Sequence, residues 1–327
     1  MDVCWGGVRL TVAQPALALD FMQPGALPSG VTFTRASTAT YFDSAGAMQT
    51  ATANTPRWDY DPVTYALRGL LIEEQRTNLP LNSATLVTQS VTVAAQVYTL
   101  SFYGTGTLTL SGVSTAGPLT GTGTQRVALT FTPTAGILTL TVTGTVQNAQ
   151  LEAGAFPTSY IPTAGALATR SADNCTYVNA GLFGGTTARS LSVDAYALQN
   201  TIAGVNAVWL NISDGTANNI MSMLTPASSS NIRYSASVGG VTQYNTGDTT
   251  TGVRPVLFKA ALSHGVVWNG AINGAIVAGS GGASLLLPNL TTMNIGVGGS
   301  LPINGYIRRA QYWASALSVA ELQAVTR

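Results

Sequence analysis

Polar and apolar residues alternate along the middle of the chain with a period of two. Tyr98, Leu100 and Phe102 fall on one side of an extended segment, and the residues between them fall on the other. The same alternation returns three times, separated by turns that carry Gly or Pro, over Thr107–Leu110, Val127–Phe131 and Ile137–Val142. Short alternating strands at this spacing are typical of an antiparallel sandwich, so this part of the chain is predicted to form one.

The last third of the chain carries a second series of short strands. Asn269-Gly270 and Asn273-Gly274 are dipeptides that favour tight hairpin turns, and one of them is expected to form such a turn. The one expected helix is Ser318–Val325, where Ser318 and Glu321 have the spacing of a capping box. The strands are expected at Ser190–Ala197, Ala207–Ser213, Asn219–Leu224, Asn231–Ser237, Val256–Leu262, Gly265–Val277, Met293–Val297 and Gly305–Trp313.

Two strand–turn–strand units precede the middle segment. Ser29–Phe42 and Trp58–Leu79 are rich in β-branched and aromatic residues, and they are punctuated by Asp43-Ser44-Ala45-Gly46 and Asp61-Pro62-Val63-Thr64. This turn chemistry predicts two hairpins. Before them, the Pro-punctuated residues 1–28 are expected to form an extended arm with one strand at Val8–Val12. The whole chain is therefore predicted to be all-β.

Composition limits the classes of partner. Only 8% of the residues are charged, the formal net charge is +1, and Lys259 is the sole lysine. Nucleic acid is discounted as a ligand because binding it needs a clustered basic stripe. The one adjacent pair of basic residues, Arg308-Arg309, is expected to point to opposite faces of a strand.

The predicted middle sandwich is especially poor in charge. Between Asn82 and Thr169 the only charged residues are Arg126 and Glu152. A surface without charge tends to associate with other copies of the same protein, so the chain is expected to oligomerise.

Several other features are expected to be absent. No apolar run approaches the length of a membrane span, and Met1–Leu19 lacks the pattern of a secretion signal. Cys4 and Cys175 are too few and too far apart for a disulfide framework or a zinc site, so both are expected to be free, buried thiols. No cofactor is expected.

Core positions are expected for three tryptophans, Trp58, Trp268 and Trp313.

Candidate acid–base residues are few and scattered. Asp59 and Asp61 share one strand face, and Asp61 is explained as the first residue of a turn. Glu73 and Glu74 are explained by solvation at a strand end or by an ion pair between subunits. His264, the single histidine, has no nucleophile pattern near it, and no segment has metal-loop spacing. No catalytic residue and no metal site are predicted, although the two carboxylates of a glycosidase need not be close in sequence.

One sheet face has the chemistry of a saccharide site. In Ala207–Ser213 the even-numbered residues make an apolar face, which leaves Trp209 and Asn211 on the other face. By the same alternation, Arg233 and Lys259 point outward from their strands. These four side chains supply an aromatic ring with amide, guanidinium and ammonium groups, which can stack on sugar rings and pair with their hydroxyls. The face is therefore predicted to bind glycan. Alternatively, this face packs on a neighbouring subunit, or on the other sheet after a one-residue shift in register.

Three motifs resemble a module found in tailed-bacteriophage fibre and head-spike proteins. They read FTRASTATYFDSAG at residues 33–46, PRWDYDPVT at 56–64 and GLLIEEQRTNL at 69–79. Residues 89–162 are similar to the small β-sandwich that follows this module, and residues 190–327 are similar to concanavalin A-like lectin jelly rolls. The resemblance is strong as far as Arg170 and weaker after it.

The resemblance implies four parts. These are an N-terminal virion-docking arm (1–28), a β-hairpin fibre module (29–80), a β-sandwich (81–165) and a concanavalin A-like lectin domain (166–327). It also implies a function: a non-catalytic structural protein of the virion, in a head spike or fibre or a tail fibre. Such a protein would form a homotrimer, dock onto capsid or tail proteins through its arm, and present its last domain to host-surface polysaccharide.

Two rival functions stay open at this point. A polysaccharide depolymerase spike would have a pair of carboxylates in a cleft, and the low number of acidic residues argues against it. A capsid decoration protein without a ligand would contribute only to the stability of the particle. The resemblance is equally compatible with a head location and a tail location.

Overall fold

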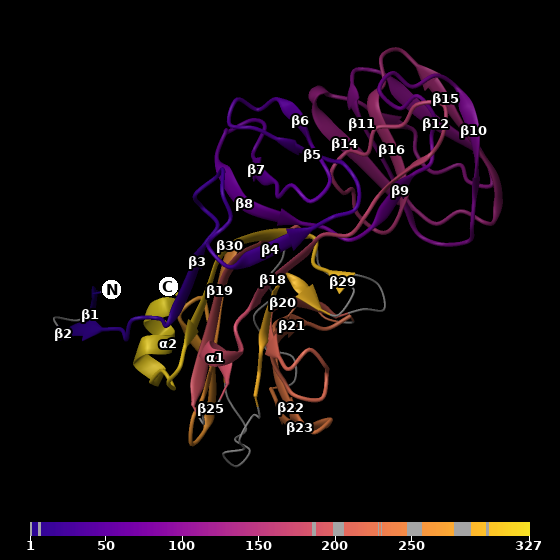
Figure 1. Ribbon diagram of the computed structural model, residues 1–327. Helices are drawn as coiled ribbons and strands as arrows, with labels where there is room; N and C mark the ends of the chain where they lie inside the picture. The colour runs from indigo at the N-terminus through magenta and orange to yellow at the C-terminus, as the bar shows by residue number, and fades with distance from the viewer. Residues whose placement is uncertain are drawn as a thin grey trace.

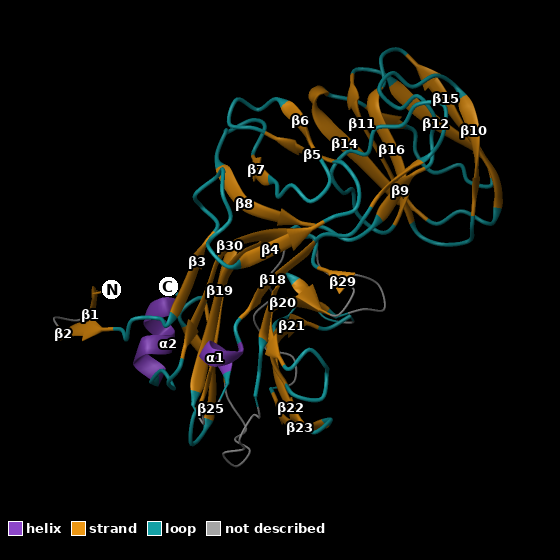
Figure 2. Ribbon diagram, in the orientation of Figure 1, coloured by secondary structure: helices purple, strands orange, loops and turns teal. Residues whose placement is uncertain are grey.

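The computed structural model describes residues 2–5, 8–184, 188–198, 206–227, 229, 231–246, 257–277, 289–298 and 301–327. Within these residues the chain forms thirty strands and two short helices, which confirms the predicted all-β class (Figure 2). Two large hydrophobic cores organise the molecule, and a third, small cluster packs against α2 (Val319–Val325). Figure 1 shows the two corresponding sandwiches, with the middle one set beside the upper end of the C-terminal one.

The larger sandwich contains two antiparallel sheets. One has the order β23 (Val241–Asn245), β22 (Arg233–Val238), β21 (Ile220–Thr225), β20 (Ala207–Ser213), β27 (Thr292–Ile295), β18 (Asn174–Val178) and β4 (Val31–Thr34). The other has the order β26 (Ala275–Val277), β25 (Trp268–Ile272), β24 (Leu257–His264), β19 (Arg189–Ala197), β30 (Gly305–Trp313), β8 (Leu67–Ile72) and β7 (Trp58–Tyr60), and β3 (Leu17–Asp20) pairs with β30. Their inner faces enclose one core, which includes Leu191, Leu210, Tyr234, Leu262 and Ile307.

The middle sandwich has its own core and confirms the strands predicted there. Its four-stranded sheet has the order β10 (Gln89–Val93), β15 (Gly136–Thr143), β12 (Thr107–Gly112) and β13 (Leu119–Thr120). Its three-stranded sheet has the order β14 (Gly123–Phe131), β11 (Tyr98–Gly104) and β16 (Gln147–Ala153). Leu100, Phe102, Leu108 and Leu140 are fully buried between the sheets, as the alternation predicts.

The remaining elements are short. Both predicted hairpins form, one as β5 (Ala39–Phe42) with β6 (Met48–Ala51) and the other as β7 with β8. The predicted Asn273-Gly274 turn joins β25 to β26, with both residues at positive φ. Ser318 caps α2 (Val319–Val325) in a capping box with Glu321, as predicted. The other elements are β1 (Asp2–Trp5), β2 (Val8–Thr11), β9 (Arg76–Asn78), β17 (Ala168–Arg170), α1 (Ala180–Phe183), β28 (Val297–Gly298) and β29 (Leu301–Pro302).

The expected four-part division differs from the arrangement of the strands. β4, β7 and β8 belong to the sheets of the C-terminal sandwich, so residues 29–80 do not make a separate hairpin module. The second half of the expected arm is built in as well, because β3 pairs with β30 and the side chains of Leu19 and Phe21 are buried in the same core, whereas β1 and β2 pair only with each other. The physical reason is that isolated hairpins are only marginally stable and gain most by joining a larger sheet.

The pair Arg308-Arg309 also differs from its prediction. Asp194 pairs with Arg309 while the next residue, Ala195, pairs with Ile307, so a bulge leaves Arg308 as an extra residue on β30. Both arginines are half-exposed beside the buried Ile307 and Ala310. The strict alternation that would place them on opposite faces is interrupted at this point.

Candidate functional site

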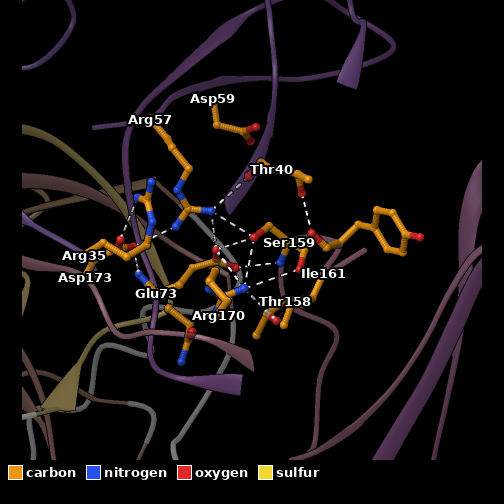
Figure 3. A network of polar contacts seen from close by, with 12 residues as sticks. Arg35, Thr40, Arg57, Asp59, Glu73, Thr158, Ser159, Ile161, Arg170 and Asp173 are labelled. Carbon is orange, nitrogen blue, oxygen red and sulfur yellow. Dashed lines mark hydrogen bonds and ion pairs between the residues drawn. The ribbon is translucent and has the colours of Figure 1, made fainter. Parts of the chain in front are cut away.

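A buried network of charged side chains lies where the two sandwiches meet (Figure 3). Arg57 is fully buried and donates from Nη1 to Glu73 Oε2 at 2.8 Å and from Nη2 to Asp173 Oδ2 at 2.7 Å. Arg35 pairs with the other oxygen of Asp173 at 3.1 Å. Arg170 lies 3.2 Å from Glu73 Oε2. Three guanidiniums and two carboxylates therefore form one continuous buried cluster.

Backbone carbonyls and Ser159 give this cluster further partners, whereas the Nε atoms of Arg57 and Arg170 have none in the described part of the chain. Arg35 donates to the carbonyls of Ser37, Thr52 and Thr55 at 2.8–3.1 Å. Ser159 donates from its backbone nitrogen and its hydroxyl to Glu73, at 2.7 and 2.6 Å. Buried ionised groups are tolerated only with such partners, because an unpaired charge in the interior costs several kcal/mol.

The electrostatics of Glu73 follow from this environment. Burial opposes ionisation, but the guanidiniums of Arg170 and Arg57 and the two donors of Ser159 outweigh it and lower the pKa of Glu73 to about 2. For Arg57, burial acts to lower the pKa, and Asp173 and Glu73 reverse that effect so that the pKa lies above its ordinary value. Both groups are held in their charged forms.

The motifs that resemble the phage module supply most of this network. Arg35, Arg57 and Glu73 come one from each of the three quoted motifs, and Arg170 and Asp173 lie just before β18. Arg57 and Glu73 also bind Ser159, which follows the last strand of the middle sandwich, so the motif residues contact both sandwiches. The interpretation of Glu73 as a solvated strand end or a partner in an inter-subunit ion pair is wrong, because its side chain is 1% exposed and its ion pairs are intramolecular.

Next to this network a cleft of about 290 Å³ opens between the two sandwiches. Ser159 belongs to both sites: it donates to Glu73 in the network, and it lines the cleft together with its neighbours Thr158 and Tyr160. The other walls come from β5, the β7–β8 hairpin, β11, β14 and β30, through residues that include Tyr41, Asp59, Arg68, Tyr103, Arg126 and Tyr306. We call this site the junction cleft. Pockets that bind small ligands often lie at such domain boundaries.

The charged groups of the junction cleft are paired with one another. Arg68 donates to Asp61 at 2.8 Å and lies 3.5 Å from Asp59. Asp59 also accepts from the Tyr306 hydroxyl and from the backbone nitrogen of Phe42, both at 2.7 Å. Burial raises the pKa of Asp59. The backbone nitrogens of Thr64 and Val63 lower the pKa of Asp61 to about 2, which confirms its predicted turn role.

Two tyrosines give the cleft an aromatic, hydroxyl-bearing wall. Tyr41 on β5 and Tyr103 on β11 are both half-buried, and in the described part of the chain neither hydroxyl has a hydrogen-bond partner. Burial raises the pKa of Tyr103, so its hydroxyl is neutral at ordinary pH. Gln125 on β14 is exposed at the same wall. Sequence reasoning did not single out these residues, since nothing in the sequence brings them together.

The predicted glycan-binding face is not formed. Trp209 is fully buried in the core, where its ring packs edge-on against Phe258 at 4.9 Å and its Nε1 donates to Thr225. A β-bulge between Val208 and Leu210 is the reason, because the extra residue turns Trp209 toward the core. Of the open alternatives, packing inside the sandwich is the correct one for this residue.

The other three predicted residues lie apart from one another. Asn211 is 2% exposed because β28 covers it, and it accepts a hydrogen bond of 2.7 Å from Asn294. Arg233 is half-buried on the seven-stranded sheet. Lys259 lies on the eight-stranded sheet, points outward as predicted, and donates to the carbonyl of Arg327 at 2.9 Å.

The surroundings of His264 and Cys175 indicate structural roles for both residues. His264 is 1% exposed and packs against Trp268, and burial together with Arg189 lowers its pKa to about 4. Cys175 is a free, buried thiol as expected, and Cys4 has no described side chain.

No three His, Cys, Asp or Glu side chains in the described ranges are arranged to hold a metal ion. No helix in the same ranges has the length and apolar character needed to cross a membrane.

Comparison with known proteins yields structural matches. No protein-family model and no curated protein sequence matches the chain. The CBM40 of the Ruminococcus gnavus IT-sialidase is similar over 43% of this chain and 83% of its own length, with 18% identity and a TM-score of 0.36. The same module bound to α2,3 sialyllactose covers 44% and 84%, with 18% identity and a TM-score of 0.38.

A sialidase is also similar. The K499G mutant of the NanB sialidase from Streptococcus pneumoniae covers 46% of this chain with 12% identity and a TM-score of 0.38. The chain spans 26% of that sialidase. Similarity at this level carries no argument about what this chain binds or whether it is catalytic.

Proposed function

We propose that this chain is a non-catalytic structural protein of a tailed-bacteriophage virion, in a head spike or fibre or a tail fibre. We further propose that it binds host-surface saccharide in the junction cleft. The virion role rests on the three motifs at residues 33–79. The observation that supports binding is the pair Tyr41 and Tyr103, whose free hydroxyls and aromatic rings line a cleft with fixed walls. Aromatic faces stack on sugar rings, and hydroxyl groups pair with sugar hydroxyls.

The pairing of charges in the cleft narrows the class of saccharide. Arg68 is engaged by Asp61 and Asp59, and Arg126 donates to the Ser101 hydroxyl at 2.8 Å and to the carbonyl of Thr158. The exposed groups left to meet a ligand are mainly neutral hydroxyl and amide groups, and Arg126 Nε, a guanidinium atom of the cleft without a partner in the described ranges, is buried. This arrangement favours a neutral saccharide over an acidic one, because an acidic ligand would have to compete with these internal partners.

Binding is tested with the purified chain on a glycan array, followed by isothermal titration calorimetry with the best neutral and acidic oligosaccharides. Tyr103→Ala is expected to weaken binding at least tenfold, which corresponds to about 1.4 kcal/mol. Tyr65→Ala is the matched control, since this tyrosine is 56% exposed and lies outside the cleft lining. Equal affinity of the Tyr103→Ala chain, or no binding by the wild-type chain, would refute the cleft as a glycan site.

Self-association is the second element of the proposal. Glu152 is fully buried and Arg126 is engaged within the chain, so the middle sandwich has a surface almost without free charge. Ile137 on β15 is 56% exposed on that surface. We propose that this face contacts other copies in a homotrimer.

Light scattering on the purified chain is expected to give the mass of a trimer. Ile137→Lys is expected to shift the measured mass toward that of the monomer. A wild-type monomer at micromolar concentration would contradict this.

The virion location has its own test. A cryo-electron-microscopy map of purified virions is expected to contain density that fits both sandwiches, at the capsid or at the tail. Absence of this chain from purified virions would refute the virion role and leave the saccharide test unaffected.

One observation bears on the rival enzymatic function. Burial raises the pKa of Asp59, which is a property of general acids in glycosidases. Both of its oxygens are occupied, by Phe42 on one side and by Tyr306 and Arg68 on the other. A carboxyl group held in this way is better suited to fixing the cleft wall than to donating a proton.

A further inference from the structure

A second concavity lies on the outer face of the eight-stranded sheet. It lies at the end of the molecule that carries α2, whose place Figure 1 shows. Its volume is about 350 Å³, and residues 12–15 and α2 form its walls. The backbone nitrogen of Ala13 donates to Glu321 at 3.1 Å, and the Trp313 indole donates to the carbonyl of Ala13 at 2.8 Å. These contacts fix residues 12–15 over the sheet. We call this site the sheet trough.

Four charged residues form one row across the floor of the sheet trough. In the strand register Asp20 pairs with Arg309, Arg309 with Asp194, and Asp194 with Lys259. Three of the four have some internal partner: Arg309 lies 3.5 Å from Asp20, and Lys259 donates to the Arg327 carbonyl. Negative and positive groups therefore alternate from β3 to β24.

Asp194 differs from its neighbours in the row. Its Oδ1 is buried and has no hydrogen-bond partner in the described part of the chain. Burial also raises the pKa of Asp194, with Arg308 as the largest opposing influence. A buried acceptor without a donor is costly, because desolvation is not compensated by a hydrogen bond. The carboxylate is thus positioned to gain from a ligand that donates to it.

We propose that the sheet trough is a second binding site, independent of the junction cleft, for a neutral ligand rich in hydroxyl groups, such as a hexose unit. A hydroxyl group can donate to Asp194 and accept from Lys259 or Arg309 at the same time. A simple cation would be repelled by Lys259, Arg308 and Arg309, and a simple anion by Asp20 and Asp194. The alternating row therefore selects a neutral ligand with both donors and acceptors.

The site is tested in a chain whose junction cleft is disabled by Tyr103→Ala. Saturation-transfer difference NMR with D-glucose, D-galactose and D-mannose in turn is expected to show at least one of them bound to this chain. Adding Asp194→Ala is expected to weaken that binding at least tenfold. Asp214→Ala is the matched control, since Asp214 lies in the β20–β21 turn away from the trough.

Folding is checked separately from binding. Because Asp194 Oδ1 has no hydrogen bond to lose and its attraction to Arg308, Lys259 and Arg309 is opposed by burial, Asp194→Ala is expected to change the melting temperature little. If that variant fails to fold, Lys259→Met takes its place, with the same expected loss of hexose binding. Absence of hexose binding in the Tyr103→Ala chain, or unchanged binding after Asp194→Ala, would overturn the proposal. Neither result depends on whether the junction cleft binds saccharide.

Discussion

Arg57 and Asp173, 116 positions apart in the sequence, form an ion pair of 2.7 Å between two fully buried side chains. Arg57 precedes β7 of the eight-stranded sheet, and Asp173 precedes β18 of the seven-stranded sheet. Asp173 also accepts from the backbone nitrogen of Glu73 at 2.8 Å. This pair therefore links the two sheets of the C-terminal sandwich, next to the wall of the junction cleft.

Removal of the charge on Asp173 is expected to destabilise the protein strongly. Asp173→Asn leaves Arg35 without a carboxylate and Arg57 with Glu73 alone, and breaking a buried pair costs about 3–5 kcal/mol. Urea denaturation followed by circular dichroism measures the free energy of unfolding. Asp43→Asn is the matched control, because Asp43 lies at the surface and asparagine can keep its turn contacts. A loss below 1 kcal/mol for Asp173→Asn would show that the network adds little to stability.

Acid is expected to weaken the protein through Glu73. Its pKa is about 2 in the folded chain against an ordinary value of 4.5. A carboxyl group whose pKa is lowered by folding contributes stability above its unfolded pKa, and that stability is lost as the pH falls from about 4.5 toward 2. The difference corresponds to about 3 kcal/mol.

Urea titrations at a series of pH values measure this contribution. Glu73→Gln is expected to be less stable at pH 7 and to lose less of its remaining stability between pH 5 and pH 3 than the wild type does. If the wild type and the variant lose the same amount over this range, Glu73 is not the group responsible.

Trp209 is expected to behave as a core residue. Trp209→Ala removes a fully buried ring, and such changes cost about 3–5 kcal/mol. Lys259 was predicted on the same face as Trp209, but it points outward. Lys259→Ala is therefore expected to change the free energy of unfolding by less than about 0.5 kcal/mol. Melting curves of the two variants decide between a buried and an exposed Trp209; similar small shifts for both would place the indole at the surface.

The non-catalytic role predicts no hydrolysis. Host polysaccharide incubated with the wild-type chain is expected to show no new reducing ends and no loss of viscosity. If hydrolysis is observed and Asp59→Asn abolishes it while the chain stays folded, the depolymerase function is correct instead. Asp61→Asn is the matched control for Asp59→Asn, because the carboxylate of Asp61 pairs with the same Arg68.

The alternation of residues predicted the extent of the strands better than the face that each residue occupies. β20 and β30 begin and end at the predicted residues, and the capping box of α2 depends only on residues three apart. The prediction failed at Trp209 and at Arg308-Arg309, because a bulge inserts one residue and shifts the alternation. Alternation alone assumes an uninterrupted ladder.

The buried network could not be predicted because its members are distant in sequence. Arg57 meets Glu73 and Asp173 only after β7, β8 and β18 have joined their sheets. One signal was available: these charged residues stand next to strands in a chain with only 8% charged residues. In so sparsely charged a protein, a charged residue beside an apolar strand indicates an internal ion pair.

The most direct test is a competition experiment on phage adsorption. Under the proposed virion function, the purified chain is added to host cells before the phage proposed to carry it, and adsorbed phage is counted. The wild-type chain is expected to occupy the host saccharide and reduce adsorption, whereas the folded Tyr103→Ala chain is expected to leave adsorption unchanged. Equal effects of the two chains, or no effect of either, would contradict attachment through the junction cleft.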